Sequence, residues 1–570
     1  MFVAFLLKMK PINSLLFTIL VFTFNFTFLQ GNASSEDPTL TISTGQIKGK
    51  SVSFRGSQVY QFLGIPFAEP PLNELRFTKP VPKKPWDNVI PVNKWGPHCI
   101  QPEFPGFNEG YPSDEDCLVL NVFVTQSTLD GVKSGIKKPR PVMVWIHGGG
   151  FSFGSANVDF YDGTPLTVMN DIVFVSINYR LGAFGFLHLP ESGIPGNFGL
   201  WDQLLALKWV KDNIHFFGGN PDQVTIFGES AGSMSVSALI VSPHSRGLFK
   251  NAIMQSGSIY DMHLWSNSKT SEVLLEKLNC SSVDDIVSCL RSVKATDFNI
   301  LAGFLYWPII GDEFLPSQPQ ELMKSIDKNV NILLGVVGNE GAGMLTTLDN
   351  KIFHPVDPVD LSVDQARKFL KQVFGEKHEE YFTKIYLDHV DPENSNELRL
   401  ALAQAIGDVS LGCPTYIFGI DAVKIGQANV YAYVQTQKPS KSFFAFISNT
   451  TWIPATHGED VPMMFGAPFL DPLGYTQEDI LLSTVMLNTW GNFAKFGEPR
   501  FFGESDIWSK WKSDESGKFE KFVMEFNTQR FGLTNNQAVE NCEKNWPFPI
   551  DSVNLNFSLD ELENLSRDEL

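Results

Sequence analysis

The pentapeptide Gly228-Glu229-Ser230-Ala231-Gly232 decides the fold of this chain. It follows residues 224–227, an apolar and β-branched run that is typical of a buried strand. It leads into residues 231–241, a stretch rich in small side chains that predicts a helix. Strand, sharp turn and helix are the setting of a nucleophile elbow, in which glycines let the backbone close around a serine. Glycine–serine turns are common, so the motif alone is weak, but its flanks make Ser230 a candidate nucleophile.

The composition limits the kinds of partner. The chain has 570 residues, a formal net charge of −19 and a pI near 5.0. Phosphate backbones bind positively charged surfaces, so this balance argues against a nucleic-acid partner.

The N-terminus has the layout of a secretory signal peptide, which we place at residues 1–31. Two lysines precede an apolar run over residues 15–29, and small and polar residues follow; Met9 is an alternative start. A membrane anchor is the alternative interpretation. The run is shorter than the roughly 20 apolar residues of a spanning helix and contains polar side chains, so we expect cleavage and no stable membrane span.

The chain ends in Arg567-Asp568-Glu569-Leu570. This differs from the retention signal Lys-Asp-Glu-Leu only by arginine in place of lysine. A chance acidic tail is the alternative, but the leader at the other end favours a protein of the endoplasmic reticulum (ER) lumen that binds the retention receptor. Residues 557–570 are predicted to be this tail.

The cysteines and glycosylation sequons fit an exported protein. An even number of cysteines, six, suggests disulfides in an oxidising compartment, and the sequence alone leaves their pairing open. The potential N-glycan acceptors are Asn32, Asn279, Asn449, Asn556 and Asn564.

A second motif follows another predicted core strand. Residues 141–146 form a continuous apolar run, which is typical of a strand buried on both faces. His147-Gly148-Gly149-Gly150 comes next, and glycines at the end of such a strand leave N–H groups free to bind an anion or oxyanion. A flexible loop is the alternative.

The remaining pattern alternates strands and helices. Core strands are expected at residues 172–177, 252–254, 332–337 and 430–434, and an amphipathic helix at 200–214. This alternation predicts an α/β fold with a mostly parallel central sheet flanked by helices, in a single domain over residues 32–556. Residues 40–48 and 52–63 resemble the two strands of a hairpin. Residues 356–408 are expected to be mostly helical, as a subdomain over the site.

A serine nucleophile needs a base and an acid that orients the base. Glu340 directly follows the strand at 332–337, and His457 lies in a loop of small residues after the strand at 430–434. A single glutamate or histidine is usually a surface residue. The order serine, acid, histidine at successive strand ends instead predicts the triad Ser230, Glu340 and His457.

Longer segments carry a family resemblance. Residues 217–232 match a nucleophile signature throughout, and residues 115–122 match a second one, with Val119 where an aromatic residue or threonine is usual. Residues 179–187 and 254–257 are also similar. From about residue 40 to 549 the chain resembles the type-B carboxylesterase/cholinesterase family of the α/β-hydrolase fold.

The resemblance implies a serine carboxylesterase that needs no metal or cofactor. It implies Ser230 as nucleophile, Glu340 as acid and His457 as base. The oxyanion hole would be formed by the N–H groups of Gly149, Gly150 and Ala231. The implied disulfides are Cys99–Cys117, Cys280–Cys289 and Cys413–Cys542.

Two departures argue against choline esters as substrates. Cholinesterases hold the quaternary ammonium by cation–π contact with a tryptophan in the first disulfide loop. Here that loop has Phe104, Phe107 and Tyr111 but no tryptophan, and Gly343 stands where an aromatic residue is usual. We expect an apolar carboxylic ester as substrate and Phe304 in its acyl pocket, as in the ER-retained esterases of liver and gut type.

Two alternatives remain. A lipase-like hydrolase of acylglycerols or sterol esters would use the same chemistry. A non-catalytic, adhesion-type cholinesterase-like protein is disfavoured by the complete triad.

Overall fold

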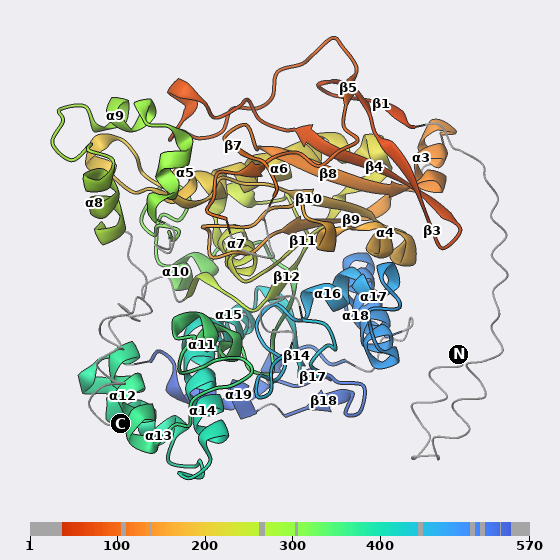
Figure 1. The fold of residues 1–570 in the computed structure, drawn as a ribbon. Helices are drawn as coiled ribbons and strands as arrows, with labels where there is room; N and C mark the ends of the chain where they lie inside the picture. Colours follow the sequence, from red (N-terminus) through yellow and green to blue (C-terminus); the bar gives the residue numbers. More distant parts are fainter. Residues whose placement is uncertain are drawn as a thin grey trace, which may run out of the picture.

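The computed structural model describes residues 37–103, 110–135, 138–260, 268–301, 306–442, 449–501, 508–513, 519–535 and 537–548. These residues form one large sheet of eleven strands, shown in Figure 1. In sheet order the strands are β18 (Gly532–Thr534), β17 (Val523–Phe526), β14 (Ala428–Gln435), β13 (Val330–Val337), β12 (Asn251–Gln255), β11 (Gly219–Glu229), β9 (Arg140–Ile146), β10 (Val173–Ile177), β8 (Val119–Thr125), β4 (Ser57–Pro66) and β3 (Lys50–Phe54).

The centre of the sheet is parallel and its two ends are antiparallel. Every neighbouring pair from β17 to β10 runs in parallel, whereas β18, β8, β4 and β3 pair in antiparallel fashion. The predicted α/β class with a mostly parallel sheet is therefore confirmed. Parallel strands end at one common edge, and ligands bind at that edge in this class of fold.

Each face of the sheet packs into its own apolar core. In β9, Val142 and Val144 belong to one core, whereas Met143 and Trp145 belong to the other. Side chains alternate between the faces of a strand, so a strand covered on both sides must be apolar at every position. This is the physical reason for the continuous apolar run at 141–146.

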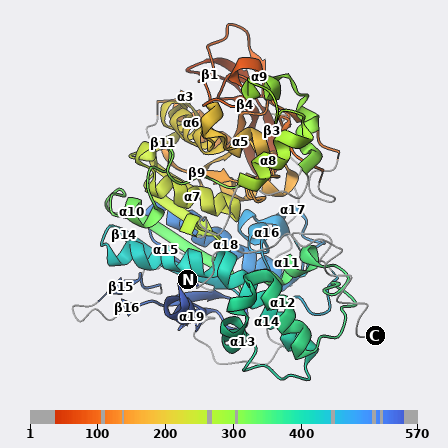
Figure 2. The same ribbon diagram turned by 90° about the vertical axis from the view of Figure 1, so that its left-hand side faces the viewer.

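Helices cover both faces. The views in Figures 1 and 2 place α7, α10 and α15 on one side and α16, α17 and α18 on the other. Their bounds, with those of the neighbouring helices, are α4 (Thr164–Asn170), α6 (Phe198–Asn213), α7 (Ala231–Val241), α10 (Pro319–Met323), α11 (Gly341–Leu348), α15 (Cys413–Lys424), α16 (Val461–Phe465), α17 (Ala467–Leu470) and α18 (Gln477–Phe496). No helix in the described part of the chain is long and apolar enough to cross a membrane.

The single hairpin expected near the N-terminus is wrong. Residues 39–48 form a hairpin of their own, β1 (Thr39–Ile42) with β2 (Gly45–Lys48), and β3 pairs separately with β4. The second turn lies at Arg55 and Gly56, whose φ values of 49° and 80° reverse the chain. The alternating pattern continued through both turns, so it concealed them.

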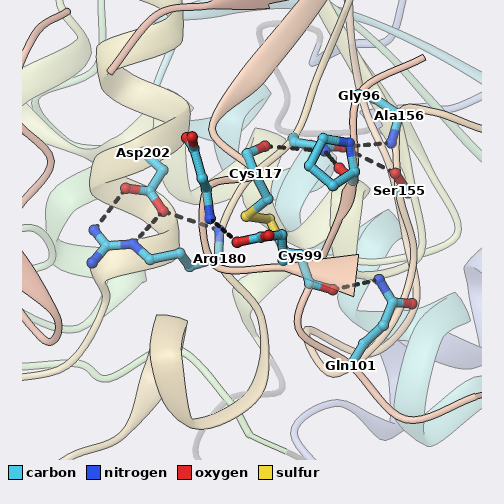
Figure 3. Close-up of a disulfide and its surroundings, with 12 residues drawn as sticks. Gly96, Cys99, Gln101, Cys117, Ser155, Ala156, Arg180 and Asp202 are labelled. Carbon is cyan, nitrogen blue, oxygen red and sulfur yellow. Dashed lines mark hydrogen bonds and ion pairs between the residues drawn. A yellow bond between two sulfur atoms is a disulfide. The ribbon is translucent and has the colours of Figure 1, made fainter. Parts of the chain in front are cut away.

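Helix α6 also differs from the amphipathic helix that was expected. Its buried residues lie on several sides and include Asp202. The carboxylate of Asp202 pairs with the Arg180 guanidinium, with 2.7 Å between Oδ1 and Nη2, as Figure 3 shows. A buried charge is tolerated when it is paired and hydrogen-bonded, so a polar position in the sequence did not mark an exposed face.

Residues 356–408 are mostly helical, as expected. The helices are α12 (Val363–Phe374), α13 (Glu379–Tyr386) and α14 (Ser395–Gly407). Helix α14 packs directly against α11: a Cβ on Gly341 would lie 2.0 Å from the Ala403 carbonyl oxygen, and one on Gly407 would lie 2.9 Å from Glu340 Cβ. Helix α14 therefore supports the Glu340 loop.

The three disulfides of the structure join Cys99 to Cys117, Cys280 to Cys289 and Cys413 to Cys542. These are the pairs implied by the family resemblance. The last bond ties α15 to α19 (Gln537–Asn545) near the end of the described chain.

Several predictions concern residues outside the described ranges. They are the leader at 1–31, the tail at 557–570 with its Arg567–Leu570 signal, and the sequons Asn32, Asn556 and Asn564. The other two acceptors, Asn279 and Asn449, are exposed in the structure.

Candidate active site

The turn between β11 and α7 is a tight elbow with Ser230 at its tip. Ser230 has φ 58° and ψ −125°, and its N–H donates to the Gln255 carbonyl at the end of β12. A Cβ on Gly228 would lie 2.5 Å from the Gly232 carbonyl carbon, and one on Gly232 would lie 2.1 Å from the Ile146 oxygen. Only glycine fits at either position, so the motif fixes this turn against the end of β9 and leaves Ser230 partly exposed.

Glu340 and His457 meet beside this elbow. His457 Nδ1 lies 2.8 Å from Glu340 Oε2, and the other carboxylate oxygen, Oε1, accepts the N–H of Val337 at 2.8 Å. The two loops are joined by their backbones as well, since the Asn339 N–H donates to the Ala455 carbonyl at 3.0 Å. The Glu340 side chain is 3% exposed and that of His457 16%, so the carboxylate is shielded from solvent and the imidazole is partly exposed.

Glu229 faces the second ring nitrogen of His457. The distance from His457 Nε2 to Glu229 Oε1 is 3.2 Å, and no hydrogen bond within the described residues joins this nitrogen to Ser230. Burial raises the pKa of Glu229; His457 opposes the shift, and Asp460 and Glu340 add to it. Burial alone would lower the pKa of His457, but the negative charges of Glu229 and Glu340 raise it. Both groups therefore hold a proton more tightly than usual.

Replacing Glu229 with glutamine is expected to move the acidic limb of the kcat/KM–pH profile to lower pH. A neighbouring carboxylate shifts a pKa by about 1–3 units. Without the negative charge of Glu229, His457 has a lower pKa and releases its proton at lower pH. The profile of wild type and variant is measured with a neutral ester. A limb that stays in place, or moves to higher pH, would show that Glu229 does not set the histidine pKa.

A buried polar network lies behind the histidine loop. Asp460 accepts hydrogen bonds from Tyr433 (2.7 Å) and Gln255 (2.9 Å), and Gln255 in turn accepts from Trp490 Nε1 at 3.0 Å. These residues come from four separate parts of the sequence, and Asp460 lies in the turn that directly follows His457. They were missed because Gln255 and Tyr433 read as ordinary strand residues.

The glycine run lies next to the nucleophile. Gly149 and Gly150 have φ values of 107° and 56°, and the N–H groups of Ser152 and Phe153 both donate to the Gly149 carbonyl at 3.0 Å. A Cβ on Gly148 would lie 3.0 Å from Ser230 Cβ. Within the described residues, the N–H groups of Gly149 and Gly150 donate to no protein acceptor. Ala231 begins α7, where first-turn N–H groups lack helical partners.

Of the residues predicted to bear on substrate choice, Tyr111 and Gly343 lie within the described ranges. Phe304, predicted for the acyl pocket, lies outside the described residues, as do Phe104 and Phe107. Tyr111 is described, and its ring stacks on that of His98 with 4.7 Å between centroids. Gly343 lies in the first turn of α11, and its N–H donates to Thr456 Oγ1 at 2.8 Å.

Comparison with known proteins agrees with this geometry. The model of the carboxylesterase family matches residues 36–543. The chain is 36% identical to an acetylcholinesterase of Bungarus fasciatus over 499 residues, which cover 81% of this chain and 78% of that protein. It is 35% identical to an acetylcholinesterase of Electrophorus electricus, over 88% of this chain and 86% of the relative. An acetylcholinesterase-1 of Trittame loki is 34% identical over 82% and 88% of the two chains.

Fold and comparisons together define the class of this protein as an α/β hydrolase. The chain belongs to the carboxylesterase family and is a serine carboxylic-ester hydrolase.

Proposed function

We propose that Ser230 is the nucleophile of this esterase, His457 its general base and Glu340 the acid that orients the base. The observation that carries the proposal is the 2.8 Å contact between His457 Nδ1 and Glu340 Oε2 beside the Ser230 elbow. With Nδ1 donating to the carboxylate, Nε2 is the nitrogen left to accept the serine proton.

The reaction proceeds through an acyl-enzyme. Ser230 Oγ attacks the ester carbonyl while His457 Nε2 takes its proton, and the imidazolium then protonates the departing alkoxide. Water repeats the attack on the acyl-enzyme with the same base. Glu229 Oε1 lies 3.2 Å from Nε2 in this structure, and catalytic hydrogen bonds often form fully only when substrate is bound.

The oxyanion of each tetrahedral intermediate is bound by the N–H groups of Gly149, Gly150 and Ala231. Among the described residues no protein acceptor takes the N–H of Gly149 or Gly150, which supports this role. A donor of this kind is worth roughly 10²–10³ in kcat.

The proposed substrates are apolar carboxylic esters rather than choline esters. Gly343 on α11 carries no ring that could lie over a quaternary ammonium, and the Cys99–Cys117 loop contains no tryptophan. Choline esters are the second candidate, because the relatives described above are named acetylcholinesterases. A lipase-like preference for acylglycerols or sterol esters uses the same residues.

The substrate class is tested with p-nitrophenyl butyrate beside butyrylthiocholine, each with and without an organophosphate. We expect organophosphate-sensitive turnover of the aryl ester at a kcat/KM far above that of the choline ester. Comparable turnover of the two would favour the choline-ester candidate. A sharp rise of activity with emulsified triacylglycerol above its solubility would favour the lipase.

We further propose that the protein is retained in the ER lumen through Arg567–Leu570. The support is the sequence: a leader at one end and a Lys-Asp-Glu-Leu-like tail at the other. Deleting the four residues is expected to release the protein into the culture medium in place of intracellular retention. A second variant exchanges Asp568 and Glu569 for alanine. It changes the signal at constant chain length and should also be released. Unchanged retention of both variants would refute the role of the tail.

A further inference from the structure

Gln101 links the first disulfide loop to the glycine loop of the site. It lies two residues after Cys99 and its side chain is buried, with 3% of the residue exposed. Gln101 Nε2 donates to the Gly154 carbonyl at 2.8 Å, and Gln101 Oε1 accepts the Gly154 N–H at 2.9 Å. The same Nε2 also donates to the Cys99 carbonyl at 3.0 Å, and Figure 3 shows these two residues side by side. One amide group thus satisfies both backbone groups of Gly154.

Gly154 in turn lies directly against the start of the glycine run. It has φ 111°, and a Cβ there would lie 2.4 Å from the Gly148 oxygen and 2.5 Å from His147 Nδ1. The preceding Phe153 carbonyl oxygen would lie 2.0 Å from a Cβ on Gly149. The backbone of residues 153–154 therefore packs directly against Gly148 and Gly149. The Gln101 side chain fixes this segment through its hydrogen bonds to Gly154.

The chain beyond Gly154 is anchored to the same disulfide. Asn178 Oδ1 accepts the Ala156 N–H at 2.8 Å, and Asn178 Nδ2 donates to the Cys117 carbonyl at 3.1 Å. In Figure 3, Ser155 and Ala156 lie above Gln101, and all three lie to the right of the Cys99–Cys117 bond. Gln101 and Asn178 thus each link a half-cystine of this disulfide to residues 154–156. Of the two, Gln101 bonds to the residue that packs against the glycine run, Gly154.

We propose that Gln101 is a positioning residue for the oxyanion hole: its side-chain amide, held by the Cys99–Cys117 loop, fixes Gly154 and through it the direction of the Gly149 and Gly150 N–H groups. The inference rests on the oxyanion role proposed above for these two glycines. Gln101 acts only through the loop.

The expected consequence is a loss in the transition state rather than in substrate binding. Oxyanion donors stabilise charge only when they already point at the oxygen, and a displacement of about 1 Å can cost 10²-fold in rate. The ground-state ester makes little use of these donors, so KM is insensitive to their direction.

The test replaces Gln101 with methionine, which keeps the length of the side chain and removes all of its hydrogen bonds. Gln223→Met is the matched control. Gln223 Nε2 also donates to two backbone carbonyls, those of Ala494 (3.3 Å) and Lys495 (2.7 Å), but it lies near the start of β11, away from Ser230. Each variant is assayed for Tm, kcat and KM with p-nitrophenyl butyrate. Inhibition constants are measured for an alkyl trifluoromethyl ketone, which forms an oxyanion on Ser230, and for the corresponding trifluoromethyl alcohol, which does not.

Gln101→Met is expected to lower kcat about 10–100-fold with KM changed less than about threefold. The inhibition constant of the ketone should rise by the same factor as kcat/KM falls, while that of the alcohol stays constant. Gln223→Met should lower Tm and leave kcat and both inhibition constants unchanged. If Gln101→Met does not fold, Gln101→Glu, which retains the acceptor for the Gly154 N–H, is measured in the same way, with the same loss expected because both donated bonds are removed.

A folded Gln101 variant with wild-type kcat and wild-type ketone inhibition would overturn the inference and leave the proposed function intact. Wild-type enzyme that binds the ketone no more tightly than the alcohol would instead contradict the oxyanion hole itself.

Discussion

Alanine in place of Ser230 is expected to lower kcat/KM for p-nitrophenyl butyrate by roughly 10⁵–10⁶-fold, to the limit of detection. The substitution removes the proposed nucleophile, so the remaining N–H donors and the base have no nucleophile to assist. The fold should survive, because Ser230 Oγ makes no hydrogen bond within the described residues and the elbow is fixed by the Ser230 N–H and two glycines. Turnover, Tm and circular dichroism measured on the same preparation check both expectations.

Ser237→Ala provides the matched control on the same helix. Ser237 Oγ donates to the Met234 carbonyl and accepts the Ile259 N–H, so its loss should reduce stability but leave kcat unchanged. Substantial aryl-ester turnover by purified Ser230→Ala enzyme would mean that another group carries the acyl transfer.

Glutamine in place of Glu340 is expected to reduce kcat about 10³–10⁴-fold with little change in KM. The Val337 N–H needs an acceptor at 2.8 Å, so the amide oxygen should face it and the NH₂ group should face His457. His457 Nδ1 then has to accept, which places the proton on Nε2, where the serine proton must go. The effect is thus a wrong tautomer rather than a lost contact, and it is measured by steady-state kinetics on the folded variant.

Glu525→Gln is the control for this exchange. Glu525 is a mostly buried carboxylate on β17 that accepts from Thr436 and pairs with Arg530, and within the described residues no hydrogen bond or ion pair joins it to His457. Near-normal rates for Glu340→Gln would show that another carboxylate orients the base, and Asp460, in the network behind the His457 loop, would be the first to test.

Local sequence was sufficient for the parts of the site that depend on strand ends. Residues 224–232 predict a strand, a turn and the start of a helix, and Gly228 and Gly232 are needed for close contacts within that turn and with the end of β9. Glu340 and His457 follow strands whose carboxyl ends share one edge of a parallel sheet, so their order along the chain was enough to suggest that they meet. The structure places them 2.8 Å apart.

Contacts between distant segments could not be predicted in this way. Glu229 was visible only as the variable position of the pentapeptide, and its approach to His457 Nε2 joins residues 228 positions apart. Gln101 and Gly154 likewise meet although they lie 53 positions apart in the sequence. The prediction of an amphipathic α6 failed at the buried Asp202, because its partner, Arg180, lies outside the helix and could not be paired with it from the sequence.

Covalent labelling of the active protein tests the central claim most directly. A fluorophosphonate is added to the purified wild-type chain until aryl-ester turnover is lost, and the modified residue is identified by mass spectrometry of its peptides. We predict one adduct for each inactivated molecule, on Ser230, formed only by the folded protein and absent from Ser230→Ala, with Ser237→Ala labelled as wild type. Loss of turnover with the adduct on another residue, or full turnover after Ser230 is labelled, would contradict the account.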